Sequence, residues 1–416
     1  MTEPDRTVRS VSVPAASTRG RLGAGIVAIP PVPRGDPAAA ILLNPQVPEA
    51  SRFCGNPWCH QPVGRTRNGA PGSTAGRCDR CGTRYSFEPK LSRGQLVGGQ
   101  YEVQGCLAHG GLGWIYLAVD RNLHDRWVVL KGLLNSGDAD AMAAAEAEVH
   151  ALTEVQHPNI VQIHNFVQHP DPEGVPVGYI VMEYVGGTSL KQIRQVRKAP
   201  LSPEQAVAYI VEIAPALSYL HAQGLAFCDL KPDNIMQTDE QLKLIDLGAV
   251  VAMDDEECAI YGTLGYQAPE ISRTGPTVAS DVYTVGRTLA MLVMDVPRVD
   301  GRPADRLPDR ASVPVLAEHE SLYRAILRAT DPDPEQRFSS IEQLTDQMTG
   351  VLHEIVAADT GTPQPRVSKY FSPQRAAFGA AGGPGVDPAQ VIAALSVPVV
   401  DPNDPGAAAL ATTSGT

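Results

Sequence analysis

The pattern of apolar residues changes part-way along the chain, and this change limits the fold more than any other feature. Between residues 101 and 185, short strand-like runs such as "WIYLAV" and "RWVVLKGLL" are broken by glycines, which predicts hairpins of a small antiparallel sheet. From Ser202 onward, apolar positions recur at helical spacing, and "SPEQ" offers the serine, proline and glutamine of a capping box. The sequence therefore predicts an α+β fold with a sheet lobe followed by a helical lobe.

The charge balance limits the classes of partner. The 416 residues include 46 Asp and Glu against 34 Lys and Arg, a formal net charge of −12, which argues against a general nucleic-acid binder. The first residues lack the apolar core of a signal peptide, and no run of about 18 uncharged apolar residues predicts a transmembrane segment. We expect a cytoplasmic protein, with peripheral membrane association or export without a signal peptide as alternatives.

Composition divides the chain into four parts. Residues 1–50 are rich in Pro, Ala, Gly and Arg without periodicity, which predicts a disordered regulatory arm. A cysteine-bearing module follows at 51–95, and the two lobes occupy 96–350. Residues 351–416 return to a Pro, Gly and Ala composition that is typical of a linker.

The stretch "FCDLKPDN" carries the chemistry of the second lobe. It packs Asp229, Lys231 and Asn234 into six positions, and "KLIDLG" then delivers Asp246 twelve residues after Asn234. The oxygen atoms of Asn234 and Asp246 suit a magnesium ion, or manganese in its place. Asp229 is left as a base, and Lys231 can place a positive charge on the group transferred. Phosphoryl transfer needs this combination of base, metal and cation.

Further motifs, met in order, resemble a eukaryotic-type protein kinase over about residues 101–346. The glycine-rich segment "AHGGLGWI" has Ala108 where the first glycine of the family's loop usually stands. The resemblance makes Lys131 in "VVLK" the lysine that holds the nucleotide phosphates, with Glu148 on an Ala-rich helix expected at about 138–155 as its partner. It makes "MEYV" the adenine hinge. It thereby implies ATP as the donor, bound by Ala108, Gly110, Gly111, Gly113, Ile115, Lys131, Met182, Glu183 and Val185.

Other motifs indicate the class of kinase. "APE" ends at Glu270, and the resemblance gives it Arg337 as a buried partner. A lysine two residues after the catalytic aspartate, as Lys231 is, is the pattern of serine/threonine kinases, and "GTLGYQAPE" with Thr263 agrees. A scaffold that binds nucleotide without catalysis is the alternative, but a scaffold has no chemical reason to keep Lys131 together with the aspartates.

Cys228 is the informative departure from the family pattern. Many kinases have an arginine before the catalytic aspartate, and it binds a phosphate on the activation loop. Residues 247–262 also contain no serine or threonine. We therefore predict a kinase that does not depend on phosphorylation of this loop and is controlled from outside the catalytic lobe.

Four of the seven cysteines form a possible metal site. Cys54 and Cys59 bracket four residues, and Cys78 and Cys81 bracket two, a spacing that suits tetrahedral zinc or iron. The choice between these ions stays open, as does a redox-sensing role. A disulfide pair is the alternative reading of the four thiols. We expect the aromatic residues Trp58, Tyr85 and Phe87 to cover the site.

Two pairs of cysteines, placed before a kinase that lacks the catalytic-loop arginine, are a rare combination. Over residues 20–405 the chain with this combination resembles the actinobacterial protein kinase G family. The resemblance implies a rubredoxin-like module folded against the catalytic cleft and regulating access to it. It implies a substrate with a forkhead-associated domain, which regulates metabolism, and autophosphorylation in the arm, where Thr7 and Thr18 are the candidates. It also implies C-terminal tetratricopeptide repeats, to which residues 351–416 would lead. Whether the protein is a monomer or a homodimer stays open.

Overall fold

The computed structural model describes most of the chain. It divides into two units, one ending at Val351 and the other beginning at Leu352. The described residues are 22–33, 35–56, 59, 61–67, 69–110, 113–132, 152–253, 262–299, 302–368, 371–372, 387–400, 404–407 and 409. The helix expected at 138–155 therefore lies almost wholly outside the described residues.

The sheet lobe is a six-stranded antiparallel sheet, as the glycine-broken apolar runs predict. The order of its strands in space is β3-β4-β5-β6-β8-β7. Strands that follow one another along the chain are therefore also neighbours in the sheet, except that β8 lies between β6 and β7. Inward-facing residues such as Val103 and Leu130 are fully buried. The strands are β3 (Leu96–Val97), β4 (Tyr101–Gly110), β5 (Gly113–Asp120), β6 (Arg126–Gly132), β7 (Ile163–Pro170) and β8 (Pro176–Glu183).

The helical lobe is built around α3 and α5. Helix α3 begins beside Ser202 with a proline at its first position and ends before Gly224, whose φ of 74° suits a left-handed stop. The predicted capping box does not form, because the Ser202 side chain makes no capping hydrogen bond within the described residues. The helices are α2 (Leu190–Arg197), α3 (Pro203–Ala222), α4 (Ile271–Thr274), α5 (Val278–Val293), α6 (Pro314–Glu318), α7 (Glu320–Ala329) and α8 (Ile341–Thr360).

Short strands line the loops of this lobe and position the residues between them. β11 pairs with both β9 and β12, and β10 pairs with β13. These pairings bring the ends of β10 and β12, which precede the two conspicuous aspartates, into fixed backbone positions. The strands are β9 (Thr188–Ser189), β10 (Leu225–Ala226), β11 (Ile235–Gln237), β12 (Leu242–Leu244), β13 (Val251–Ala252), β14 (Arg298–Val299) and β15 (Arg302–Pro303).

The cysteine module shares its core with the sheet lobe. Its hairpin of β1 (Ala75–Arg77) and β2 (Arg84–Ser86) leads to Phe87, whose carbonyl accepts a hydrogen bond from Trp114 Nε1 (3.2 Å). The Tyr116 hydroxyl accepts from the Lys90 backbone N–H (2.8 Å). One buried cluster runs from the module cysteines to the strands of the sheet. The module is thus packed against the sheet lobe through both apolar and hydrogen-bonded contacts.

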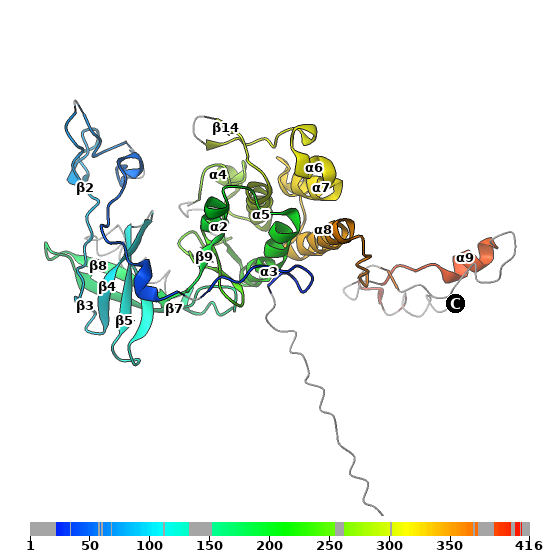
Figure 1. Cartoon of the computed structure of the whole chain (residues 1–416), viewed down its shortest axis with the longest axis horizontal. Helices are drawn as coiled ribbons and strands as arrows, with labels where there is room; N and C mark the ends of the chain where they lie inside the picture. The colour runs from blue at the N-terminus through cyan, green and yellow to red at the C-terminus, as the bar shows by residue number, and fades with distance from the viewer. Residues whose placement is uncertain are drawn as a thin grey trace, which may run out of the picture. The chain divides into compact units, whose positions relative to one another are not determined.

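The segment before the module is held at several points, although its composition predicts disorder through residue 50. Ala24 N donates to Glu212 Oε1 on α3 (2.9 Å), Gln237 Nε2 donates to the Pro30 carbonyl (2.7 Å), and Leu42 N donates to the Cys106 carbonyl on β4 (2.8 Å). Figure 1 shows this blue segment running from the helical lobe to the sheet lobe. Only two short 3₁₀ turns, Pro37–Ala40 and Glu49–Ser51, form in it among the described residues. Periodicity fails to reveal it because its order comes from single contacts to other elements.

The second unit contains one short helix among its described residues beyond α8. Helix α9 (Pro388–Ala394) coincides with the amphipathic run "PAQVIAA", and Ser372 N donates to the Val397 carbonyl nearby (2.8 Å). The domain boundary expected at 350 falls inside α8, which continues to Thr360. Among the described residues, no helix combines the length and apolarity needed to cross a bilayer.

Candidate active site

The backbone at the catalytic loop is held by a buried carboxylate of α5. Asp281 accepts hydrogen bonds from the Phe227 and Cys228 backbone N–H groups (2.7 and 2.8 Å). Asp229 N donates to the Phe227 carbonyl (2.8 Å), a tight turn in which Cys228 adopts a φ of 62°. Such a φ is costly for a residue with a side chain, so the Asp281 bonds help to keep the turn. They fix the direction in which the next residue, Asp229, leaves the backbone.

The Asp229 carboxylate has three described side-chain partners. Lys231 Nζ and Asn234 Nδ2 donate to Oδ2 (2.6 and 3.0 Å), and Thr263 Oγ1 donates to Oδ1 (2.7 Å). Lys231 Nζ also donates to Thr263 Oγ1 (2.6 Å). The structure thus brings together the three residues that the sequence selected in "DLKPDN" and adds Thr263. A hydroxyl presented to Asp229 would meet a carboxylate whose orientation is already set.

Asp246 follows β12 and faces the lysine of β6. Lys131 Nζ lies 2.5 Å from Asp246 Oδ1, and the Gly248 backbone N–H donates to the same oxygen (3.0 Å). Burial acts to raise the pKa of Asp246, but the Lys131 ammonium outweighs it, and the net pKa lies below the ordinary value. Asp246 is therefore ionised at neutral pH, as a magnesium ligand must be. Glu148, the predicted partner of Lys131, lies outside the described residues.

The described residues of the glycine-rich segment lie at the end of β4 and the start of β5. Gly110 pairs with Gly113, which has a φ of 126° that a residue with a Cβ rarely adopts. Ala108 lies opposite Ile115, and Ile115 in turn lies opposite Lys131 on β6. These three residues are therefore adjacent in the sheet, although they are far apart in sequence. Gly111 lies outside the described residues.

The predicted adenine hinge lies at the end of β8. Met182 is buried in the strand, and Glu183 is its last residue, with Val185 beyond it. The Glu183 carboxylate accepts from Gln162 N (3.0 Å) and from Lys243 Nζ on β12 (2.5 Å). Sequence reasoning missed Lys243, and its place three residues before Asp246 was the only signal available. The pair ties the hinge to the strand that delivers Asp246.

Cys228 is packed among apolar side chains. It is 1% exposed and belongs to a cluster with Ala226, Ala249 and Ile271, against which Val251 also packs. At this position many kinases have an arginine that binds a phosphate on the activation loop. Here Cys228 instead makes apolar contacts with residues that follow Asp246.

The expected pair of Glu270 and Arg337 forms in the helical lobe. Arg337 donates from both terminal nitrogens to the two carboxylate oxygens, at 2.6 and 2.8 Å, and both side chains are almost fully buried. Arg337 Nε also donates to the Asp331 carbonyl (2.7 Å), so its charge is well bonded. This pair is structural, since it ties α4 to the loop before α8.

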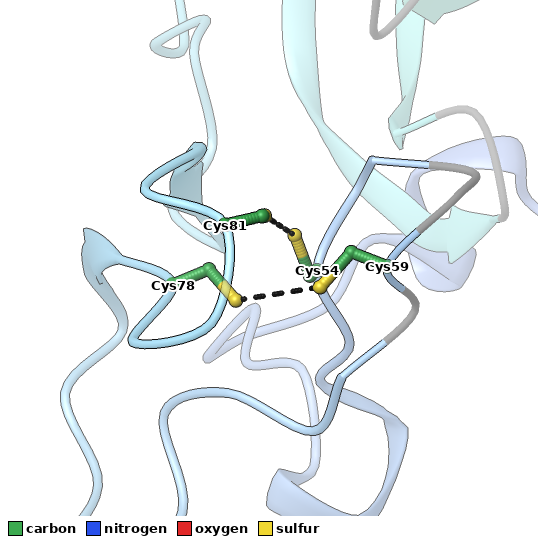
Figure 2. A group of neighbouring side chains, drawn as sticks. All are labelled: Cys54, Cys59, Cys78 and Cys81. Carbon is green, nitrogen blue, oxygen red and sulfur yellow. Dashed lines mark hydrogen bonds between the residues drawn. The ribbon is translucent and has the colours of Figure 1, made fainter.

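The four module cysteines converge on one point. Their sulfur atoms all lie within 4.8 Å of one another, with Sγ–Sγ distances of 3.5 Å between Cys54 and Cys81 and 3.7 Å between Cys59 and Cys78 (Figure 2). A tetrahedral ion with metal–sulfur bonds of about 2.3 Å requires sulfurs about 3.8 Å apart. A disulfide would require about 2.05 Å. The thiols therefore fit a zinc or iron ion and not the alternative of a disulfide.

The sulfur atoms differ in their surroundings. Burial raises the pKa of Cys54 to about 12, whereas hydrogen bonding to Thr83 lowers the pKa of Cys81 to about 6. The Tyr85 and Phe87 rings lie with centroids 5.6 Å apart at an angle of 37°, and both pack in the buried cluster that contains Cys54 and Cys78, while Trp58 lies outside the described residues. Cys81 is thus more readily ionised than Cys54.

Comparisons with known proteins agree with this geometry. The family described as "Protein kinase domain" matches residues 101–354, more than half of the chain. The chain belongs to the protein kinase family. A second family, "Protein kinase G rubredoxin domain", matches residues 16–91, so the chain carries a rubredoxin domain of the protein kinase G type before its kinase domain. That match begins well before the cysteines, in agreement with the anchored segment at 22–50.

Individual relatives support the assignment to this kinase group. The chain is 53% identical to "Serine/threonine-protein kinase PknG" of Mycolicibacterium smegmatis, over 94% of this chain and 52% of the relative. It is 52% identical to the Mycobacterium leprae protein of the same name, over 94% of this chain and 54% of that one. The chain thus spans about half the length of these curated relatives. The solved PknI kinase domain of Mycobacterium tuberculosis matches 63% of this chain and 99% of its own length, with a TM-score of 0.51 and 26% identity.

Proposed function

We propose that the protein is an ATP-dependent serine/threonine protein kinase. The observation that carries the proposal is the cluster around Asp229, where a carboxylate, an ammonium, an amide and a hydroxyl meet within 3.0 Å. Asp229 would accept the proton of a substrate hydroxyl. The hydroxyl oxygen would form a bond to the γ-phosphorus of ATP, while the bond between that phosphorus and the β–γ bridging oxygen breaks and ADP leaves. Lys231 would stabilise the negative charge of the phosphoryl group in transit.

The residues for the nucleotide and its metal fit the same reaction. Asn234 and Asp246 would hold magnesium, which neutralises phosphate charge when bound. Lys131, which lies 2.5 Å from Asp246, would contact the α- and β-phosphates. The glycine-rich segment would admit the phosphates close to the backbone, and Glu183 and Val185 would present backbone groups to adenine. Each of these roles is thus assigned to a described side chain or backbone group, apart from those of Glu148 and Gly111, which lie outside the described residues.

The preference for serine and threonine is supported by Lys231 and Thr263. Their mutual bond and their contacts with Asp229 place a cation and a hydroxyl directly beside the base. The position of Lys231 two residues after the base is the pattern of serine/threonine kinases.

Regulation through the metal module is the second part of the proposal. The apolar packing of Cys228 supports activity that is independent of activation-loop phosphorylation. Phe87 of the module contacts His109 of the glycine-rich segment, with ring centroids 6.3 Å apart, so that a zinc- or iron-bound module would influence nucleotide binding. We also propose a forkhead-associated-domain substrate that regulates metabolism, recruited by autophosphorylated Thr7 or Thr18, and action in the cytoplasm as a monomer or homodimer.

The deciding experiment combines the purified chain with ATP and magnesium. We expect mass spectrometry to find phosphothreonine in residues 1–50 and phosphate on an added forkhead-associated-domain protein. The Asp229→Asn chain, which is matched in size and fold, should show neither. Nucleotide binding without any transfer by the unaltered chain would contradict the proposal and favour the scaffold. Phosphate on residues other than Thr7 and Thr18 would overturn only the choice of arm sites.

A further inference from the structure

A second charged site lies on the cysteine module, and none of the residues that line it belongs to the kinase motifs. A cavity of about 300 Å³ opens there, and three arginines, Arg67, Arg77 and Arg80, line it. Gln61 and Tyr85 add polar groups, and Asp79 is its one acidic residue. Three guanidinium groups at one small cavity point to an anionic ligand, because like charges are gathered only at a cost.

The module is basic in an acidic protein. Residues 51–93 contain seven arginines and Lys90 against only Asp79 and Glu88, an excess of six positive charges, whereas the whole chain carries −12. Four thiolates with a divalent ion would remove about two of these charges. The surface around the cavity therefore attracts anions that the rest of the molecule repels.

The arginines of the module fall into two groups. Arg52 is buried and donates to three backbone carbonyls, those of Val47, Gly64 and Gly72, so its charge serves the fold. The cavity arginines are less engaged. Arg77 donates to the Gly82 carbonyl (3.1 Å), which steadies one edge of its guanidinium. Arg80 has no hydrogen bond or ion pair with any residue of the described chain.

Arg67 forms an ion pair with Asp79, the acidic residue that lines the cavity. Its Nη1 lies 3.0 Å from Asp79 Oδ2, and the two side chains are 72% and 77% exposed. An ion pair in such contact with water contributes little stability, so an incoming anion can replace Asp79 at small cost. Asp79 thus competes with the anionic ligand for the Arg67 guanidinium group.

We propose that this cavity binds a phosphorylated serine or threonine side chain of a protein. A phosphate dianion offers three oxygens to the three guanidinium groups, whereas a carboxylate fills only one fork. Arginine clusters are a recurrent means of recognising phosphorylated segments. Docking beside the kinase domain would keep a phosphorylated protein at high local concentration. The phosphorylated residue is the product of the proposed reaction, but its binding requires no catalysis.

Binding is measured by fluorescence anisotropy, with the full metal-loaded chain and a labelled phosphothreonine peptide. The same peptide with threonine, and with glutamate in its place, serves for comparison. We expect the phosphopeptide to bind at least about tenfold more tightly than either, since hydrogen bonds to charged groups are worth that much. Equal affinity for the glutamate peptide would overturn the phosphate assignment, and equal affinity for the threonine peptide would overturn the site altogether.

Variants locate the binding on the module. Arg77→Gln with Arg80→Gln should weaken the binding of the phosphopeptide at least tenfold, whereas the charge-matched control Arg93→Gln with Arg273→Gln, at two exposed arginines that do not line the cavity, should change it less than twofold. Asp79→Asn should strengthen binding, an effect that general loss of structure cannot produce. Equal weakening in both double variants would overturn the cavity as the site.

Two controls distinguish a loss of phosphopeptide binding from damage to the metal centre and from a failure of the proposed kinase activity. The absorption of the metal–thiolate centre in each variant checks that the module is intact, and Arg77→Gln alone serves if the centre is altered by the change at Arg80. The Asp229→Asn chain should bind the phosphopeptide as the unaltered chain does, so that a failure of the proposed kinase activity leaves this test standing.

Discussion

The cluster around Asp229 and the cluster of four cysteines both gather residues from separate segments, but they are completed differently. Asp229 has Lys231, Asn234 and Thr263 as bonded partners within the protein. The sulfurs of the cysteine cluster face chiefly one another, at 3.5 and 3.7 Å. The catalytic cluster is therefore preorganised by the fold, whereas the cysteine cluster needs an ion to be stable.

Metal removal should break the cysteine cluster and leave the other intact. Because the binding free energy of a structural ion, about 10–16 kcal/mol in small metal domains, is also folding free energy, chelation or Cys54→Ser should unfold the hairpin of β1 and β2. Hydrogen exchange at residues 75–86 would report it. Cys106→Ser, at a buried cysteine outside the cluster, is the control and should leave these amides protected. Protection that survives metal removal would show that the module core alone suffices.

Loss of one hydroxyl should weaken the catalytic cluster without unfolding it. Thr263→Val removes the hydrogen bonds to Asp229 and from Lys231, and hydrogen bonds to charged groups are worth about 1.5–3 kcal/mol. We expect kcat to fall about 10- to 100-fold with little change in the KM for ATP. Thr263→Ser keeps the hydroxyl and should retain most of the rate. A valine variant as active as the serine variant would remove Thr263 from the cluster.

The tie between the hinge and β12 should act on nucleotide binding. Lys243→Met leaves Glu183 without its cation, and a loss of about 1 kcal/mol would raise the KM for ATP about fivefold while kcat changes less. Lys191→Met breaks the more exposed pair with Asp233 and is the matched control, for which no change is expected. A rise in kcat for the Lys243 variant would mean that the pair restrains the enzyme.

The anchor of residues 22–50 on α3 should depend on pH. Burial raises the pKa of Glu212 above the ordinary 4.5, against the lowering effect of the Ala24 and Gly23 N–H groups. The folded state therefore binds this proton more strongly than the unfolded state, and the resulting stability is complete below about pH 4.5 and is lost as the pH rises through the folded pKa. Glu212→Gln should remove this dependence.

Unfolding in urea between pH 4 and 7 measures the difference between the two chains. Glu320→Gln is the contrasting control, because its hydrogen bond from Arg324 lowers the pKa of Glu320 and gives the opposite sign, with stability lost as the pH falls. A Glu212→Gln chain that kept the full pH dependence would assign it to other groups.

Short motifs predicted Asp229, Asn234 and the two cysteine pairs, and the family resemblance predicted the distant pair of Glu270 and Arg337. Neither predicted the partners of Thr263 and Lys243. Asp229 and Asn234 lie within six positions of one another, so a short motif reveals them. The role of Thr263 rests on a contact made across 34 residues, and that of Lys243 on one made across 60. No pattern in the residues around either position specifies such a partner. The sheet and α3 were predictable because their apolar periods repeat, whereas residues 22–50 are ordered by isolated contacts.

Those isolated contacts have a mechanical consequence. The chain is attached to the helical lobe at Ala24 and Pro30 and to the sheet lobe at Leu42, so it crosses between the lobes once there and again at the end of β8. Twelve residues can span at most about 40 Å. Because the chain crosses twice, the distance by which the two lobes can separate is limited by the length of the segment between Pro30 and Leu42 as well as by the stiffness of the hinge. A single proteolytic cut between Pro30 and Leu42 would release that limit without removing any group that touches the nucleotide.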